Sequence, residues 1–109
     1  METEINILHY PDGRFCLTVM DADEATYALF DERELQGGGY TWECIVQSLV
    51  EMRLPDALPR LHFGAEADNM HVDSDDRQLL EQVAALVQAA IADRELLVAA
   101  MEHAGENLE

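Results

Sequence analysis

Apolar and polar residues alternate over residues 4–10 (EINILHY) and again over residues 14–20 (RFCLTVM). This period of two, with β-branched and aromatic side chains in both segments, predicts two β-strands. Pro11, Asp12 and Gly13 stand between them and are typical of a tight turn, so the strands are predicted to form a hairpin. The second strand is predicted to present Phe15, Leu17 and Val19 on one face and Cys16, Thr18 and Met20 on the other.

Two helices are predicted to follow this hairpin. Acidic residues at 21–24 suit a helix start, and they open a helical stretch that runs to about Leu35. The glycines at 37–39 end this helix, and a second helix runs from about Trp42 to Arg53. Its apolar positions recur with the helical period and are predicted to face the core: Ile45, Val46, Leu49 and Val50.

The second half of the chain repeats this arrangement. Residues 61–63 (LHF) and 70–72 (MHV) are predicted to pair as a hairpin across the turn-prone segment GAEADN. A strongly amphipathic helix is predicted from about residue 75 to residue 92, and a last helix covers about residues 94–104.

Three residues are predicted to mark helix ends in this half. Ser74 and Asp93 suit N-caps of the two helices, and Gly105 suits the position that closes the last one. The element order is therefore ββααββαα. It predicts an α+β fold in which a small antiparallel sheet, made of two β-hairpins, packs against helices. A chain of 109 residues suits a single domain, 1–109, with one hydrophobic core.

The charge is strongly unbalanced. The chain has 23 Asp and Glu residues against six Arg and no Lys, for a net charge of -17. This balance argues against a nucleic acid or an anionic membrane as the partner, and it favours a basic protein partner. The start of the chain lacks a cationic stretch followed by a long apolar one, so we expect a cytoplasmic protein whose two cysteines, Cys16 and Cys44, are reduced.

The segment GGGYTWE at residues 37–43 is the most unusual stretch of the sequence. A phosphate-binding P-loop needs a lysine, which this chain lacks, and Glu43 would occupy the place of the anion. A dinucleotide-binding loop needs a preceding strand, and the pattern predicts none there. The sequence therefore predicts no nucleotide site at these glycines.

A structural interpretation of the same segment is that Thr41 caps the second helix, with Tyr40 packed on Ile45 as a hydrophobic staple. One glycine would suffice to end the preceding helix, so three indicate positive φ or a very close backbone approach. We expect the loop to hold Tyr40 and Trp42 against the core and to leave Glu43 at the surface. The alternative is an exposed aromatic pair that binds a partner.

The motif Gly37-Gly38-Gly39-Tyr40-Thr41-Trp42-Glu43 resembles the signature of the immunity protein 51 family, small bacterial α+β proteins linked to polymorphic toxin systems. The likeness extends over roughly residues 27–90, through the second hairpin and the long helix. The resemblance implies a protein that binds and neutralises a toxin, and it does not identify the toxin.

Metal and catalytic sites are weakly indicated. A calcium loop starting at Asp73 would need Glu at its twelfth position, where Ala84 stands, and the acidic clusters suit helix caps. His62 and His71 could face each other across the second hairpin, which leaves a chance metal site open. Cys44 with a histidine is the only nucleophile pair, and neighbouring glutamates oppose its thiolate. We therefore predict no catalytic residue, no metal ligand and no cofactor.

The sequence thus predicts a binding protein rather than an enzyme. Its partner is expected to be a cognate toxin with a basic surface, such as a nuclease-like toxin would present; the alternative is an acidic interaction domain with a basic partner that is not a toxin. The candidate toxin-binding residues are acidic: Glu43, Asp73, Asp75, Asp76, Asp21 and Asp23. The structural loop motif consists of Gly37, Gly38, Gly39, Tyr40 and Trp42.

Overall fold

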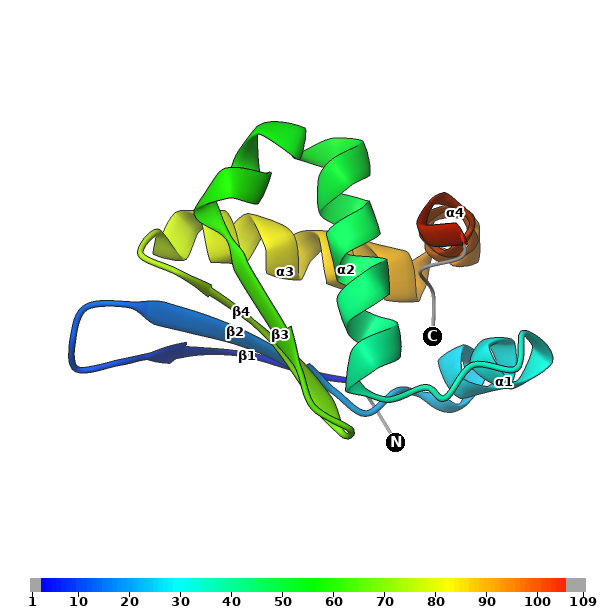
Figure 1. Cartoon of the computed structure of the whole chain (residues 1–109). Helices are drawn as coiled ribbons and strands as arrows, with labels where there is room; N and C mark the ends of the chain where they lie inside the picture. The colour runs from blue at the N-terminus through cyan, green and yellow to red at the C-terminus, as the bar shows by residue number, and fades with distance from the viewer. Residues whose placement is uncertain (1–2, 106–109) are drawn as a thin grey trace.

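The computed structural model describes residues 3–105, so both ends of the expected 1–109 domain lie outside the described residues. Strands and helices follow the predicted order, with one short 3-10 helix added (Figure 1). The elements are β1 (Glu4–His9), β2 (Phe15–Met20), α1 (Glu24–Glu32), α2 (Gly39–Arg53), η1 (Pro55–Arg60), β3 (His62–Ala65), β4 (Asn69–Ser74), α3 (Arg77–Ala92) and α4 (Arg94–Ala104). The predicted α+β fold is confirmed.

The two hairpins form one antiparallel sheet with the strand order β1-β2-β4-β3. The central strands β2 and β4 join the hairpins, and their register pairs Leu17 with Val72 and Cys16 with Asp73. Directly paired residues point to the same face of a sheet. Helices α2 and α3 cover the face that carries Leu17 and Val72 (Figure 1). We call the opposite face, which carries Cys16 and Asp73, the open face.

The covered face forms the hydrophobic core. Leu17 and Val19 are fully buried there and Phe15 packs against the same core, which confirms the predicted alternation along β2. Helix α2 contributes the predicted apolar stripe, and all of its members are fully buried: Ile45, Val46, Leu49 and Val50. Burial of this apolar surface is the main source of the free energy that holds the helices on the sheet.

The glycines lie where α2 passes close to the turn between β3 and β4. A Cβ atom at Gly38 would collide with the carbonyl oxygen of Ala67, and one at Gly39 would collide with that of Asn69. The N–H of Gly39 donates a hydrogen bond to the carbonyl oxygen of Ala67 at 3.1 Å. Gly37 has a φ of 81°, which glycine adopts without strain. Close backbone approach and positive φ, as predicted, account for all three glycines.

The predicted cap at Thr41 is wrong, because α2 already begins at Gly39 and Gly38 is its N-cap. The β3–β4 turn supplies the partner for the first helical N–H, so the helix starts earlier than a side-chain cap would place it. The Thr41 hydroxyl is buried instead and accepts a hydrogen bond from the N–H of Gly37 at 3.1 Å.

The two aromatic residues of the motif have opposite environments. Trp42 is fully buried, packs edge-to-face on Phe30 at 5.5 Å between ring centroids, and donates from Nε1 to the carbonyl oxygen of Asp21 at 3.0 Å. This confirms its predicted burial. Tyr40 is 44% exposed, so the expectation that it packs against the core on Ile45 is wrong. The early helix start turns Tyr40 outward.

Helix ends elsewhere differ from prediction by a few residues. Helix α1 ends at Glu32 rather than at Leu35, because Glu34 has a φ of 58°, which is not helical. At its other end the helix begins at Glu24, after Asp21, which has a φ of 61°. Asp76, and not Ser74, caps α3. The cap at Asp93 and the closing position at Gly105 are confirmed, the latter with a φ of 56°. None of the helices within residues 3–105 has the length and hydrophobicity needed to cross a membrane.

Candidate functional site

The six acidic candidate residues fall into two groups at opposite ends of the sheet. Asp21 and Asp23 follow the end of β2, and Glu43 follows the first turn of α2 next to Trp42, which donates a hydrogen bond to the backbone carbonyl of Asp21. Strands β2 and β4 are antiparallel, so the last residue of β2 pairs with the first of β4. The end of β4, where the second group lies (Asp73, Asp75 and Asp76), is therefore the far end of the sheet.

The first group has structural partners. The carboxylate of Asp23 caps α1 by accepting a hydrogen bond from the N–H of Thr26 at 2.9 Å. The backbone carbonyl of Asp21 holds the indole of Trp42, and Glu43 is half-buried. These contacts fix the junction of β2, α1 and α2, so this end of the molecule combines negative charge with a rigid backbone.

In the second group, Asp76 also has a structural role. Its carboxylate accepts a hydrogen bond from the N–H of Leu79 at 3.2 Å and forms an ion pair with Arg60 at 2.6 Å. The hydrogen bond from Leu79 and the neighbouring guanidinium of Arg60 hold the pKa of this carboxyl below its ordinary value. Asp75 is exposed, whereas Asp73 points onto the open face.

A hollow of about 440 Å³ lies at this end of the sheet. Asp73 and Asp75 line it together with His62, Arg14 and Arg60. Both arginines are engaged by carboxylates, since Arg14 pairs with Asp12 at 2.9 Å and Arg60 pairs with Asp76. The hollow is therefore a concave surface whose two arginines are already paired with carboxylates, and Asp75 is its exposed acidic residue.

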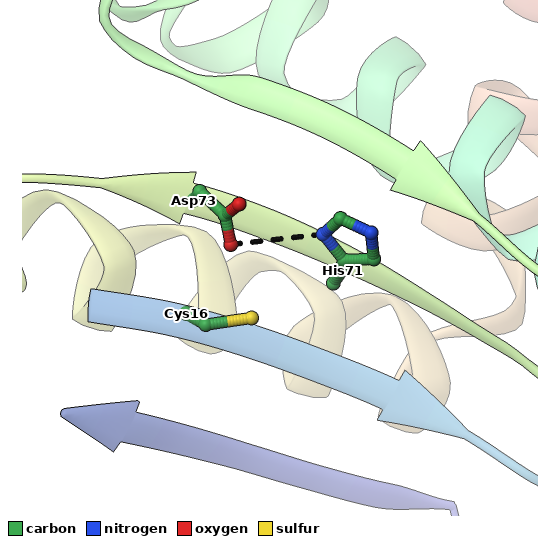
Figure 2. A group of neighbouring side chains, drawn as sticks. All are labelled: Cys16, His71 and Asp73. Carbon is green, nitrogen blue, oxygen red and sulfur yellow. Dashed lines mark ion pairs between the residues drawn. The ribbon is translucent and has the colours of Figure 1, made fainter. Parts of the chain in front are cut away.

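On the open face the structure brings together three residues that the sequence analysis did not combine: Cys16, His71 and Asp73. Cys16 on β2 is paired with Asp73 on β4, and His71 lies two residues before Asp73 on the same face. One ligand atom of each lies within 4.8 Å of the others. Figure 2 shows the three side chains gathered over the adjacent strands β2 and β4.

A glycine on β3 makes room for this cluster. Gly64 is the residue opposite His71, and a Cβ atom there would lie 2.5 Å from Nε2 of the imidazole. The ring therefore occupies the space that a side chain at Gly64 would fill. His62, which the sequence suggested as the residue facing His71, is paired with Asp73 instead, so that pairing is wrong by two residues.

The carboxylate of Asp73 is incompletely satisfied. Its Oδ1 lies 3.6 Å from Nδ1 of His71, which is beyond hydrogen-bond distance. By distance and angle no described residue donates a hydrogen bond to this buried oxygen, although the Cys16 thiol lies close enough to the carboxylate for Asp73 to raise the pKa of that thiol. A buried polar atom without a partner costs about 1–3 kcal/mol, so its presence calls for a ligand or another explanation.

The thiol of Cys16 is buried, with 2% of its surface exposed. Burial raises its pKa, the hydrogen bond with Tyr10 lowers it, and the adjacent Asp73 raises it again, with a net upward shift. The same contact with Cys16 raises the pKa of Tyr10. A thiol with a raised pKa is protonated at neutral pH and is a poor nucleophile. The cluster is therefore poorly suited to covalent catalysis, and a metal ion bound through this sulfur would have to displace the thiol proton.

Cys44 lies in a different place, on α2 on the other side of the sheet. It lines a hollow of about 420 Å³ with Glu51 and His103. His103 Nε2 lies 3.9 Å from a carboxylate oxygen of Glu51, an ion pair when the histidine is protonated. Neither cysteine forms a disulfide bond within the part of the chain that the structure describes.

Comparison with known proteins gives one match. The family model described as Immunity protein 51 matches residues 6–106, a range that begins within β1 and includes every later strand and helix named above. No curated protein and no solved structure matches the chain significantly. The match confirms the resemblance that the glycine-tyrosine-tryptophan motif indicated.

Proposed function

The chain belongs to the immunity protein 51 family, and from this premise we propose that it binds a cognate polymorphic toxin in the cytoplasm and neutralises it by occlusion. The family match over residues 6–106 carries the proposal. Neutralisation by binding needs a rigid surface rather than a reaction centre, and the buried core beneath the sheet supports such a surface.

We further propose that the toxin presents a basic surface, as a nuclease-like toxin would. The support is the net charge of -17 on a chain without lysine. A protein field of one sign attracts a partner of the opposite sign and raises the association rate constant. The observation therefore favours a cationic partner, and it also fits the alternative of a basic protein that is not a toxin.

Two acidic surfaces are candidates for the contact, at the two ends of the sheet. The surface with Asp73 and Asp75 is favoured, because Asp75 is exposed and both residues line a hollow that a partner side chain can enter. The surface with Asp21, Asp23 and Glu43 is the second candidate. The carboxylates of Asp23 and Asp76 already accept hydrogen bonds as helix caps, so a partner would add the least interaction energy at these two residues.

We propose that the chain acts without catalysis. Cys16 is buried with a raised thiol pKa, and Cys44 has Glu51 beside it in its hollow. Neither arrangement favours a thiolate nucleophile. Occlusion of a toxin surface does not require a nucleophile.

The test is to mix the purified chain with the toxin encoded by the neighbouring gene and to measure complex formation, toxin activity and association kinetics. We expect a stable complex, loss of toxin activity, and slower association as ionic strength rises from low to physiological, with dissociation changing less. The variant Asp75→Lys should slow association, whereas Glu102→Lys on α4, an equal change of charge at an exposed site, should do so less.

The outcomes separate the parts of the proposal. Absence of a complex with that toxin contradicts the immunity function. Association that is indifferent to salt contradicts the basic partner but not toxin binding. A chain that binds the toxin without reducing its activity contradicts neutralisation by occlusion, whereas a chain that binds a different basic protein and not the toxin supports the alternative, an acidic interaction domain.

A further inference from the structure

The cluster on the open face combines three kinds of metal ligand: a sulfur of Cys16, an imidazole nitrogen of His71 and a carboxylate oxygen of Asp73 (Figure 2). Among residues 3–105 it is the one group of this kind. We propose that these three residues form a binding site for a Zn²⁺ ion. This proposal does not rest on the proposed toxin binding, although Asp73 also lines the hollow favoured there as a contact surface.

The spacing of the ligand atoms fits a tetrahedral ion. Bonds of about 2.0–2.3 Å from Zn²⁺ to nitrogen, oxygen and sulfur place neighbouring ligands about 3.3–3.8 Å apart. Nδ1 of His71 and Oδ1 of Asp73 are 3.6 Å apart, within this range. The sulfur of Cys16 completes the group, since all three ligand atoms lie within 4.8 Å of one another.

The unsatisfied oxygen of Asp73 is an independent observation that points to a cation. Oδ1 is buried, and no described residue donates a hydrogen bond to it. A metal ion would supply the positive partner that this atom lacks. It would also explain why an acceptor oxygen and an imidazole nitrogen face each other at 3.6 Å, too far apart for a hydrogen bond.

The backbone holds the site in place. Cys16 and Asp73 occupy directly paired positions on the central strands, and His71 is on the same strand as Asp73. Gly64 leaves room for the imidazole beside β3. Ligands mounted on strands are placed more accurately than ligands on loops, so the site needs little rearrangement on binding.

The chemistry of the ligands selects the class of metal. Ca²⁺ and Mg²⁺ prefer oxygen ligands alone, whereas sulfur and imidazole suit Zn²⁺ and similar transition metals. Three protein ligands leave a fourth position for water. The side chains of His71 and Asp73 are 38% and 24% exposed, so that position is open to solvent.

The test uses the purified full chain after treatment with a chelator. Titration with Zn²⁺ in a calorimeter should show one ion bound per chain. Co²⁺ in place of Zn²⁺ should give the thiolate-to-metal charge-transfer absorption and the intense visible bands of a tetrahedral site. These spectra report the Cys16 sulfur directly, and a purely structural role of the three residues would not produce them.

Variants localise the ion. Cys16→Ser and Asp73→Asn, both close in shape to the original residues, should each weaken Zn²⁺ binding more than the roughly 10- to 100-fold typical of changes beyond the direct ligands. Gly64→Ala removes no ligand but displaces His71, and it should weaken binding as well. Cys44→Ser and His103→Ala are matched controls for surface thiol and imidazole, and they should bind as the parent does.

The proposal is overturned if the parent binds no stoichiometric Zn²⁺, or if the Co²⁺ form lacks thiolate absorption. It is also overturned if the two control variants lose the ion while Cys16→Ser and Asp73→Asn keep it. Far-ultraviolet circular dichroism of each variant shows that it is folded before its affinity is interpreted. Should one variant fail to fold, the Co²⁺ spectrum of the parent still decides the question.

Discussion

The two faces of the sheet differ in what positions their side chains. On the covered face, Leu17 and Val72 are fully buried beneath α2 and α3, and apolar packing holds them, as it holds Trp42 of α2. On the open face, Cys16 and Asp73 come from separate hairpins and meet only through the pairing of β2 with β4. Apolar periodicity therefore predicts which side chains occupy the covered face, whereas the register between β2 and β4 decides which side chains meet on the open face.

The largest expected effect is on the covered face. Trp42→Ala should lower the free energy of unfolding by about 3–5 kcal/mol, because it removes a fully buried indole and its hydrogen bond to Asp21. Chemical denaturation measures this loss. Tyr40→Ala, an exposed neighbour in the same motif, is the control and should change stability by only about 0.5 kcal/mol. If Trp42→Ala is as stable as the parent and loses its partner, the motif is a recognition surface.

Alanine substitutions at two glycines test the difference between the two faces. Gly39→Ala should destabilise the protein by about 1–3 kcal/mol, because the new Cβ would strike backbone carbonyls of Glu66 and Asn69 that cannot move aside. Gly64→Ala should cost less, because it meets only the half-exposed imidazole of His71, which can rotate. Equal losses in a denaturation series would contradict the distinction between a packed and an adaptable face.

Replacement of Cys44 is expected to have a smaller effect on stability. Cys44→Ala should lower stability by less than about 1 kcal/mol, since the side chain is half-buried, and it should leave toxin neutralisation intact. A protection assay with the toxin of the neighbouring gene checks this. Loss of protection by a variant that is folded and still binds the toxin would reopen a catalytic role for Cys44.

The smallest expected effect is the pH dependence at Asp76. Its folded-state pKa is lowered, so its interactions stabilise the protein above the ordinary carboxyl value of 3.8. That contribution is lost as pH falls through the lower folded-state value. The variant Asp76→Asn keeps a capping side chain but loses the charge. The parent should be slightly more stable than this variant at neutral pH and equal to it well below 3.8; a difference that persists in acid would contradict the pairing with Arg60.

The predictions that were wrong concern positions where a contact from a distant segment overrides the local sequence preference. Thr41 has a capping side chain, but the carbonyl of Ala67 provides the partner that starts α2 three residues earlier. Tyr40 then turns outward. Similarly, the sequence placed His62 opposite His71, whereas the register of β3 places Gly64 there. In each case the deciding contact comes from a residue far away in the chain.

The sequence by itself determined the order of the elements, the core-facing positions of β2 and α2, and the burial of Trp42. Apolar periodicity and glycine conformational preference are local properties that a chain carries without its fold. The tertiary structure alone decided that six acidic residues separate to two ends of the sheet and that Cys16 meets His71 and Asp73. The physical reason is that apolar alternation decides which face each side chain occupies, whereas the pairing of β2 with β4, and its position in steps of two residues, depends on contacts between segments far apart in the chain.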